Sequence, residues 1–415
     1  MRNIVKIAAK NLLRYKRRTL LTTALIALGV VSVLLFIAVS GSFKSLMIGQ
    51  ITDSVMGHVQ IHRKGYVASI DSLPLNRNLN AKQLAKVEEV LRAEPAVESF
   101  TLRLKLGAMF SNFTETTSIR LNAVVPAEEF TSMPLLASRI SGKKAGEELL
   151  APGGVLVPAL LAKGMQVNVG DTVVLVATNR DGSVNGKPFT VHGVLDGISG
   201  PGGRDGLIHL DDAKELLRID GAEISEIAVR LKDIDDLPAV AARLEQQLGG
   251  LTNKEGKPVF EVHTWEKLSP FYNIAKMIDL MTLFIKVMLV AIVLVSIMNV
   301  MIMAVYERIG EIGTIAAIGT TPGKILALFL AEGFLLAIVG TVTGTVISLL
   351  AIAGLNNAAI TFNFGMQTGL LLQPAISIGQ IAPILAMVIS ISVLASLQPA
   401  WKAAKMDPIA ALRHV

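Results

Sequence analysis

Four long apolar stretches limit what this chain can fold into more than any other feature of its sequence. They run from Leu20 to Val39, from Phe284 to Tyr306, from Ile325 to Ala353 and from Ile378 to Leu397. Each is about as long as the ~20-residue helix that crosses the hydrocarbon core of a bilayer. The chain is also 52% hydrophobic and only 17% charged, which is too apolar for an ordinary soluble protein. We therefore predict an α-helical membrane protein with four transmembrane helices.

The first stretch has a second interpretation, because the AVSG sequence at positions 38–41 resembles the cleavage site of a signal peptide. The apolar core of a signal peptide is usually ~7–15 residues long, and this stretch is longer. We interpret it as a membrane anchor that stays in the protein.

The charged residues that flank the four stretches predict their orientation. Seven of the basic residues lie within the first eighteen positions: Arg2, Lys6, Lys10, Arg14, Lys16, Arg17 and Arg18. Arg308 and Lys324 lie in the segment that joins the second and third stretches, and Lys402 and Lys405 follow the fourth. Residues 354–377, which join the third and fourth stretches, carry no charge. Because basic loops stay in the cytoplasm, we expect both termini inside and residues 42–272 exported.

The basic residues of the N-terminal segment recur every four positions up to Arg14, and Ile4, Ala8, Leu12 and Tyr15 lie on roughly the opposite side of a helix. This pattern fits an amphipathic helix on the inner leaflet, and it fits equally well a basic flank without a formed helix. The chain has a net charge of +6, and seven of its basic residues lie beside an apolar stretch. This position favours membrane lipid as the partner and excludes nucleic acid. The absence of cysteine excludes disulfides and thiol chemistry.

The exported segment is predicted to be an α+β domain of two lobes. Residues 79–97 have the apolar spacing of a helix, and the alternation in residues 97–110 is typical of a strand. Residues 167–195 predict two strands around a turn at 181–186, and two further helices are expected at 210–219 and 236–248. We expect one lobe to be formed by the ends of the domain and the other by residues 155–217.

The complete division of the chain is as follows. We predict a cytoplasmic amphipathic helix (1–18), a first transmembrane helix (19–41), a periplasmic α+β domain (42–272), a stalk with the second transmembrane helix (273–306), a cytoplasmic coupling helix and loop (307–324), a third transmembrane helix (325–353), a short periplasmic loop (354–377), a fourth transmembrane helix (378–400) and a cytoplasmic tail (401–415).

Several short motifs resemble nucleotide-binding, metal-binding or catalytic sequences but lack features that those functions need. The GTTPGKI sequence at 319–325 has three rather than four residues between its glycines and lacks the hydroxyl of a phosphate-binding loop, so we predict no nucleotide site there. The glycine-rich sequence at 197–206 predicts a flexible surface loop. His58 and His62 lie in a segment that alternates like a strand, where they would be ~13 Å apart, so we predict no metal site. No catalytic set stands out, and we predict no enzyme in this chain alone.

Two polar residues lie within the apolar stretches. Glu332 is about eight residues into the third stretch, and a charge in the apolar zone must face protein or water. We expect Glu332 to have a structural role more readily than a role in substrate or proton transfer, with Asn299 of the second stretch as a candidate hydrogen-bond partner.

The sequence YERIGEIGTIAAIGTTPGK at 306–324 interrupts the apolar stretches with a short charged segment. Glu307 and Glu311 are one helical turn apart, as are Arg308 and Ile312, so the segment predicts an amphipathic helix that offers charged and apolar contacts to a cytosolic partner. The alternative is a loop at the membrane surface with helical capping.

Residues 299–344 resemble the FtsX-type permease domain, which has an E-R-x-x-E-I-G motif, an A-x-G motif and a Glu in the next span. The tail QPAWKAAKMDPIAALR is similar to the ending of that domain, and GGVLVPALLAKGMQVNVGDTVVLV resembles its periplasmic part. The chain is identified as a member of the MacB-like (type VII) mechanotransmission class of ABC transporters, and it is similar to the lipoprotein-releasing LolC/LolE group.

This resemblance implies a bacterial inner-membrane permease that has no cofactor of its own. A dimer of a separate cytoplasmic ABC ATPase, using ATP and magnesium, would dock on the coupling helix, and a second, identical or related permease chain would complete the dimer. The resemblance assigns the docking role to Glu307, Arg308, Glu311, Ile312, Gly313, Ala317 and Gly319.

The cargo implied is a lipoprotein or another amphiphile, extracted or released from the inner membrane. Two alternatives remain open at this point. One is MacB-like efflux of peptides or small molecules with an adaptor and an outer-membrane channel. The other is activation of a cell-wall hydrolase without transport, as in the division protein FtsX.

Overall fold

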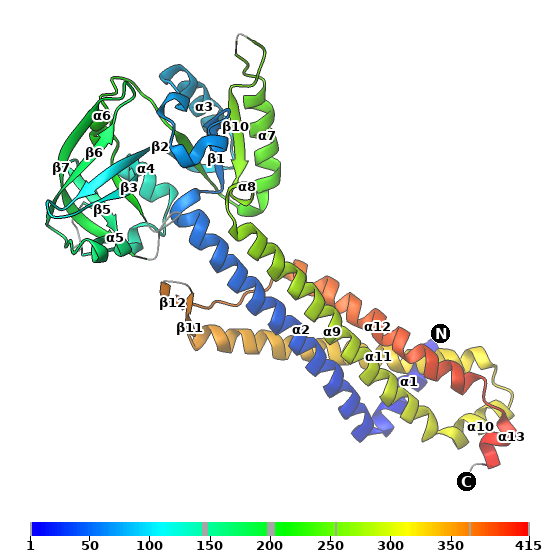
Figure 1. Cartoon of the computed structure of the whole chain (residues 1–415). Helices are drawn as coiled ribbons and strands as arrows, with labels where there is room; N and C mark the ends of the chain where they lie inside the picture. Colours follow the sequence, from blue (N-terminus) through cyan, green and yellow to red (C-terminus); the bar gives the residue numbers. More distant parts are fainter. Residues whose placement is uncertain (1, 143–147, 197–203, 254, 365–366, 414–415) are drawn as a thin grey trace. The chain divides into compact units, whose positions relative to one another are not determined.

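A computed structural model describes residues 2–142, 148–196, 204–253, 255–364 and 367–413, in two compact units (Figure 1). The membrane unit comprises Met1–Ser45, Ala275–Phe362 and Gly369–Val415, and the α/β unit comprises Leu46–Ile274 and Asn363–Thr368. Residues 197–203, most of the glycine-rich segment, lie outside the described residues.

The membrane unit is helical. Its helices are α1 (Arg2–Arg14), α2 (Lys16–Ile51), α9 (Phe271–Tyr306), α10 (Ile309–Ala317), α11 (Pro322–Asn357), α12 (Ile378–Ala404) and α13 (Pro408–Arg413), of which α2 and α9 continue into the α/β unit. Four of them, α2, α9, α11 and α12, are long and apolar enough to cross a membrane. Helices satisfy every backbone polar group within one segment, as a bilayer requires. The prediction of four transmembrane helices is confirmed.

Helix α2 extends beyond the membrane span predicted for residues 19–41. It runs to Ile51 and is followed by a π-helix at Thr52–Met56. Hydropathy indicates where the membrane ends rather than where a helix ends, and residues 42–51 are polar enough to leave the membrane while remaining helical. Between α11 and α12, strands β11 (Thr361–Phe364) and β12 (Gln367–Leu371) form a small sheet where the sequence predicted only a loop.

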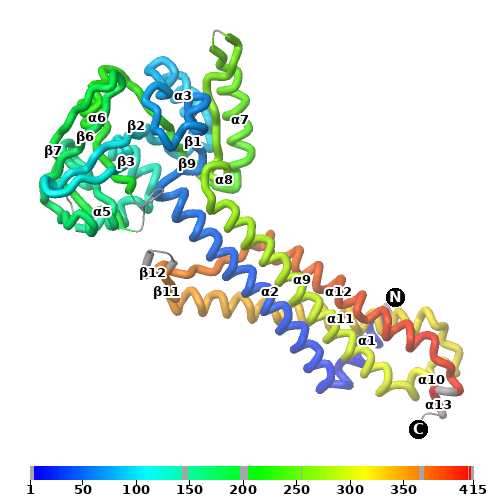
Figure 2. The backbone as a smooth tube through the Cα atoms, viewed as in Figure 1, coloured from blue at the N-terminus to red at the C-terminus, as the bar shows by residue number. Residues whose placement is uncertain are grey.

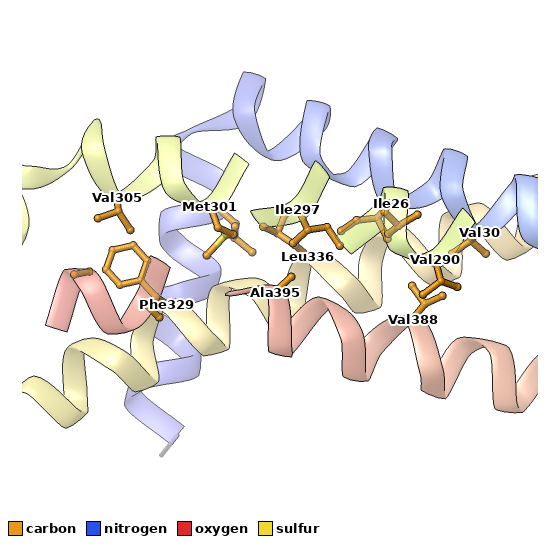
Figure 3. Close-up of a cluster of buried hydrophobic side chains, with 14 of the residues drawn as sticks. Ile26, Val30, Val290, Ile297, Met301, Val305, Phe329, Leu336, Val388 and Ala395 are labelled. Atoms are coloured by element: carbon orange, nitrogen blue, oxygen red, sulfur yellow. The ribbon is translucent and has the colours of Figure 1, made fainter. Parts of the chain in front are cut away.

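The core of the membrane unit lies where α2, α9, α11 and α12 meet. Ile26 of α2, Ile297 of α9, Leu336 of α11 and Val388 of α12 belong to one buried apolar cluster (Figure 3). A Cβ atom at Gly340 of α11 would lie 2.6 Å from Cγ2 of Ile26, too close for any other residue. Glycine therefore allows the backbones of α11 and α2 to approach closely, as is common between membrane helices.

The α/β unit contains one continuous sheet of ten strands. Its strands are β1 (Val59–Arg63), β2 (Val97–Ser111), β3 (Thr116–Val124), β4 (Ile140–Ser141), β5 (Gly154–Pro158), β6 (Thr172–Thr178), β7 (Val184–Leu195), β8 (Asp205–His209), β9 (Glu226–Leu231) and β10 (Phe260–Thr264). Its helices are α3 (Ala81–Ala93), α4 (Pro126–Ser132), α5 (Ala159–Gly164), α6 (Leu210–Leu217), α7 (Leu237–Gly249) and α8 (Trp265–Leu268).

Strand β2 joins two lobes of this unit. Its first half pairs with β9, which continues through β1 to β10, and α3 and α7 pack on this lobe. Its second half closes a ring of six strands in the order β2, β3, β8, β5, β7 and β6, because β6 pairs back to β2. The second lobe was predicted to begin at residue 155, but it also takes β3 and half of β2. A 15-residue strand is long enough to pair with different strands in the two lobes of one sheet.

A buried ion cluster holds the two lobes together at β2. The Arg103 guanidinium lies 2.6 Å from Glu129 of α4 and 2.9 Å from Glu226 of β9, and Lys105 Nζ lies 2.6 Å from Glu226. Burial alone would raise the pKa of Glu226, but Lys105, His62 and Arg103 outweigh it and hold that pKa well below its usual range. Ionised Glu226 therefore stabilises the fold above its unfolded pKa of about 4.3, and this contribution is lost as the pH falls through the lower folded pKa.

Replacing Arg103 with alanine is expected to lower the free energy of unfolding of the α/β unit by about 3–5 kcal/mol, because buried Glu129 loses the guanidinium that faces it and Glu226 keeps only Lys105 and His62. The chain has two tryptophans, and in a Trp401→Phe background the fluorescence of the buried Trp265 reports denaturant unfolding of this unit alone. The control is Lys257→Ala, whose side chain is 74% exposed and whose ion pair with Glu255 should contribute less than about 1 kcal/mol. Equal losses in the two variants would contradict a stabilising role for the cluster.

Candidate functional site

The predicted coupling segment forms a short helix between two membrane helices. Helix α10 (Ile309–Ala317) lies between the end of α9 at Tyr306 and the start of α11 at Pro322. It ends because Gly319 has a φ of 95° and allows two closing bonds, from Gly319 N–H to the Ala316 carbonyl and from Thr320 N–H to the Ile315 carbonyl. This pair is the Schellman motif that ends many helices. Gly319 thus has a local structural reason to be glycine.

An ion network anchors this segment to α11. Arg308 Nη1 donates to both carboxylate oxygens of Glu332, at 3.0 and 3.2 Å, and Arg308 Nε donates to Glu311 at 2.9 Å. Arg308 is 5% exposed and Glu332 is fully buried. Burial would lower the pKa of Arg308, but Glu332 and Glu311 outweigh it and raise that pKa, so the arginine stays charged. The charge of Glu332 is compensated within the protein, as the apolar zone requires.

Residues near the N-terminus complete the network. Asn11 Nδ2 donates to Glu332 at 2.8 Å, and the Tyr15 hydroxyl donates to Glu311 at 2.9 Å. Arg18 lies farther away, 3.8 Å from Glu332. Burial would raise the pKa of Glu311, but the hydrogen bonds from Arg308 and Tyr15 outweigh it and lower that pKa. We call Asn11, Tyr15, Arg18, Arg308, Glu311 and Glu332 the Glu332 cluster.

Sequence reasoning missed the part that α1 plays in this cluster. The available signal was Asn11, which interrupts the apolar side of the N-terminal helix between Ala8 and Tyr15. A polar residue on the side of a helix that packs on protein needs a hydrogen-bond partner. The partner expected for Glu332 was Asn299, and that expectation is wrong. Asn299 is exposed on α9, because Ile297 and Met301, two residues away on either side, turn the opposite face of the helix toward the core.

The other predicted docking residues divide between buried and exposed positions. Ile312 belongs to the apolar core, and a Cβ atom at Gly313 would lie 2.8 Å from Cβ of Ala411 in α13. Glu307 and Ala317 are exposed, and Glu311 is half-buried. Arg308, Ile312 and Gly313 were expected to face a cytosolic partner and instead face their own chain, because each completes a contact inside the membrane unit. The docking role of the segment stays a prediction.

Helix α13 forms the rest of this surface. It packs on α10 at the end of the membrane unit, as Figure 2 shows, with Ala411 buried in the contact. Three apolar side chains at this end remain open: Ile318 is 81% exposed, Ile409 70% and Leu412 47%. Such a group of exposed apolar residues is typical of a surface that binds another protein. We call the exposed surface that α10 and α13 form together the docking surface, after the role predicted for it.

The space beside the Glu332 cluster is too small for cargo. Arg308, Glu311, Ile315, Lys324 and Phe329 are among the residues that line a cavity of about 40 Å³. A cavity of this size has room for water but not for a lipid or a peptide. Within the described residues, the cluster therefore acts by holding helices together rather than by binding a substrate.

The architecture defines the class of the protein. Four membrane-spanning helices with an α/β domain between the first two, and a short charged helix between the second and third, are the features of an ABC transporter permease subunit. The FtsX-like permease C-terminal model matches residues 283–408. The two matched models describe a permease domain and a periplasmic domain.

The family follows from the other half of the chain. The MacB-like periplasmic core domain model matches residues 19–247, more than half of the chain, and the chain belongs to this family. It is 24% identical to the lipoprotein-releasing system transmembrane protein LolC of Neisseria meningitidis, over 95% of this chain and 94% of that one. It is 24% identical to the uncharacterized ABC transporter permease YknZ of Bacillus subtilis, over 99% of this chain and 98% of that one.

A third relative is named as both an ATP-binding protein and a permease. The pyoverdine export ATP-binding/permease protein PvdT of Pseudomonas putida is 29% identical over 66% of this chain, which corresponds to 38% of that protein. The periplasmic region of MacB from Actinobacillus actinomycetemcomitans matches 51% of this chain and 89% of that structure, with 16% identity and a TM-score of 0.36.

Proposed function

We propose that this permease couples ATP hydrolysis by a cytoplasmic ATPase dimer to movements of its periplasmic α/β unit that release lipoproteins or other amphiphiles from the inner membrane. The basic residues around α1 and α10 support cytoplasmic termini. A second permease chain, identical or related, completes the transporter, since an ATPase dimer presents two docking clefts.

The observation that carries this proposal is the continuity of α9. The helix runs without a break from Phe271 to Tyr306, and the docking surface follows three residues later. A second helix is fastened to it, because Lys44 of α2 forms an ion pair of 2.6 Å with Asp279 and Ser40 shares a hydrogen bond of 2.7 Å with Thr282. Two helices joined in this way are stiff enough to transmit a displacement that begins at the ATPase.

The similarity to LolC over nearly the whole of both chains supports a lipoprotein as the cargo. The similarity to PvdT supports a second candidate, the export of a small molecule. The two differ in what the transporter holds during its cycle, so the cargo itself distinguishes them.

Purification of the tagged full-length chain after photo-crosslinking in cells tests the proposal. We expect an ABC ATPase to co-purify and acylated proteins to be crosslinked. Ile318→Asp should abolish recovery of the ATPase, because it places a charge on the docking surface, whereas Val184→Asp in the α/β unit, at a residue 63% exposed, should not. Recovery of the ATPase with Ile318→Asp would contradict the docking surface. A crosslinked cell-wall hydrolase in place of acylated proteins would contradict the cargo.

A further inference from the structure

The outer face of α1 carries two parallel rows of side chains. Val5, Ala9 and Leu13 form an apolar row, and all three are exposed, Leu13 by 70%. Lys6, Lys10 and Arg14 are exposed one position further along, so a basic row lies beside the apolar row. Helical residues four apart lie above one another, and the two rows run the length of the helix.

Among the described residues, no acidic group neutralises Lys6 or Lys10, whereas Arg14, the last residue of the basic row, lies 3.5 Å from Glu311. No acidic residue precedes Asp53 in the sequence. Among the residues that the structure describes, Lys6 and Lys10 form no ion pair, and Lys16 and Arg17 continue the basic surface into α2. Exposed apolar and basic rows side by side are what a helix needs to lie at a membrane surface that contains anionic lipids, with one row among the acyl chains and the other at the headgroups.

The inner face of the same helix is fixed to the protein. Ala8 and Leu12 are buried, and α1 packs along α11. Asn11 is hydrogen-bonded to Glu332, and just beyond the helix Tyr15 is hydrogen-bonded to Glu311. A force on α1 is therefore passed to the residues that precede and begin α10.

We propose that α1 binds the headgroups of anionic phospholipids through Lys6 and Lys10, with Val5 and Leu13 among the acyl chains, and that this contact restrains the docking surface through the Glu332 cluster. Charge complementarity selects the ligand, since a basic surface beside a membrane attracts acidic lipid. The inference holds whichever cargo the permease moves.

The binding step is tested with the full-length chain in detergent, titrated with phosphatidylglycerol or phosphatidylcholine and followed by native mass spectrometry. Lys6→Gln with Lys10→Gln should weaken phosphatidylglycerol binding about 30-fold, because each basic residue near an anionic surface contributes about fivefold. The control is Lys82→Gln with Lys86→Gln, two exposed lysines at the same spacing on α3, which should leave binding unchanged. Equal binding by both variants would overturn the site, and competition by inorganic phosphate would assign it to a free anion.

The absence of cysteine in the chain allows a separate test of depth. A nitroxide on Ala9→Cys in phosphatidylglycerol nanodiscs should be accessible to oxygen and shielded from a water-soluble nickel complex, and a nitroxide on Lys10→Cys should show the reverse. Equal exposure of both labels to the nickel complex would place α1 in water and overturn the proposal.

Hydrogen exchange tests the link to the docking surface. Amides of residues 309–317 should exchange several-fold more slowly in phosphatidylglycerol than in phosphatidylcholine nanodiscs, because a restrained helix opens less often. The Lys6→Gln and Lys10→Gln variant should lose this difference. The same exchange rate in both lipids would show that lipid binding at α1 does not restrain residues 309–317.

Discussion

Replacing Arg308 with alanine should destabilise the membrane unit by about 3–5 kcal/mol and abolish the response of the ATPase to the permease. The substitution leaves the fully buried carboxylate of Glu332 with a hydrogen bond from Asn11 and only the distant guanidinium of Arg18. An uncompensated buried charge is among the most destabilising changes in a protein. Denaturant unfolding followed by Trp401 in a Trp265→Phe background measures the first effect, and ATPase activity of the reconstituted complex measures the second.

A double variant separates stability from coupling. Arg308→Met with Glu332→Leu replaces the ion pair by apolar side chains, which commonly restores or increases stability. We expect this variant to fold as the parent does and still to fail in coupling, since Glu311 loses its hydrogen bond from Arg308 and Asn11 loses its bond to Glu332, so neither α1 nor α10 is tied to α11 through the cluster. Lys324→Ala, at an exposed residue near the same helix, is the control and should behave as the parent. Normal coupling in the double variant would mean that the Glu332 cluster is only structural.

Inserting a Gly-Ser linker before Asp279 should abolish cargo release while ATP hydrolysis continues. The linker would interrupt α9 and displace Asp279 and Thr282 from Lys44 and Ser40, so a displacement of the docking surface would be absorbed in a flexible segment. Release of a crosslinkable cargo from nanodiscs, in which both faces of the membrane are accessible, measured together with phosphate production, checks the expectation.

Two controls make this experiment specific. The same linker at Gly182, in the turn between β6 and β7, should be tolerated because it lies in an exposed turn. Asp279→Asn removes the exposed ion pair but leaves α9 continuous and the hydrogen bond between Ser40 and Thr282 in place, so cargo release should stay near normal. Full release by the chain with the linker before Asp279 would rule out transmission through α9.

The sequence predicted the transmembrane helices well because a bilayer imposes a single requirement, about 20 apolar residues, that can be counted along the chain. The same reasoning located β2, β6 and β7 from their alternation. It could not predict that β6 pairs back to β2 and closes a ring, because pairing depends on which strands meet in space. For the same reason the second lobe was expected to begin at residue 155 rather than within β2.

The candidate site shows a similar limit. Glu332 was expected to face protein or water, with Asn299 of the neighbouring apolar stretch as a candidate partner, whereas the structure pairs it with Arg308 and with Asn11, which is 321 residues away. Ile312 and Gly313 were assigned to ATPase docking, yet Ile312 lies in the apolar core and Gly313 packs against Ala411 of α13. That helix has only six residues, too few to be stable in isolation, and the predicted tail at 401–415 gave no sign that it would pack on α10.

The distance along the chain between Asn11 and Glu332 also sets an order of events during synthesis. At ~5–20 residues per second, Asn11 leaves the ribosome roughly 15–60 s before Glu332 does. Throughout this interval Arg18, and later Arg308, have no carboxylate of Glu332 to face. Chains that end before Glu332 thus lack the one fully buried carboxylate of the cluster and have only Glu307 and Glu311 to face these arginines. Closure of the Glu332 cluster therefore follows the insertion of α11, and α12 and α13 join the membrane unit after Glu332 has been made.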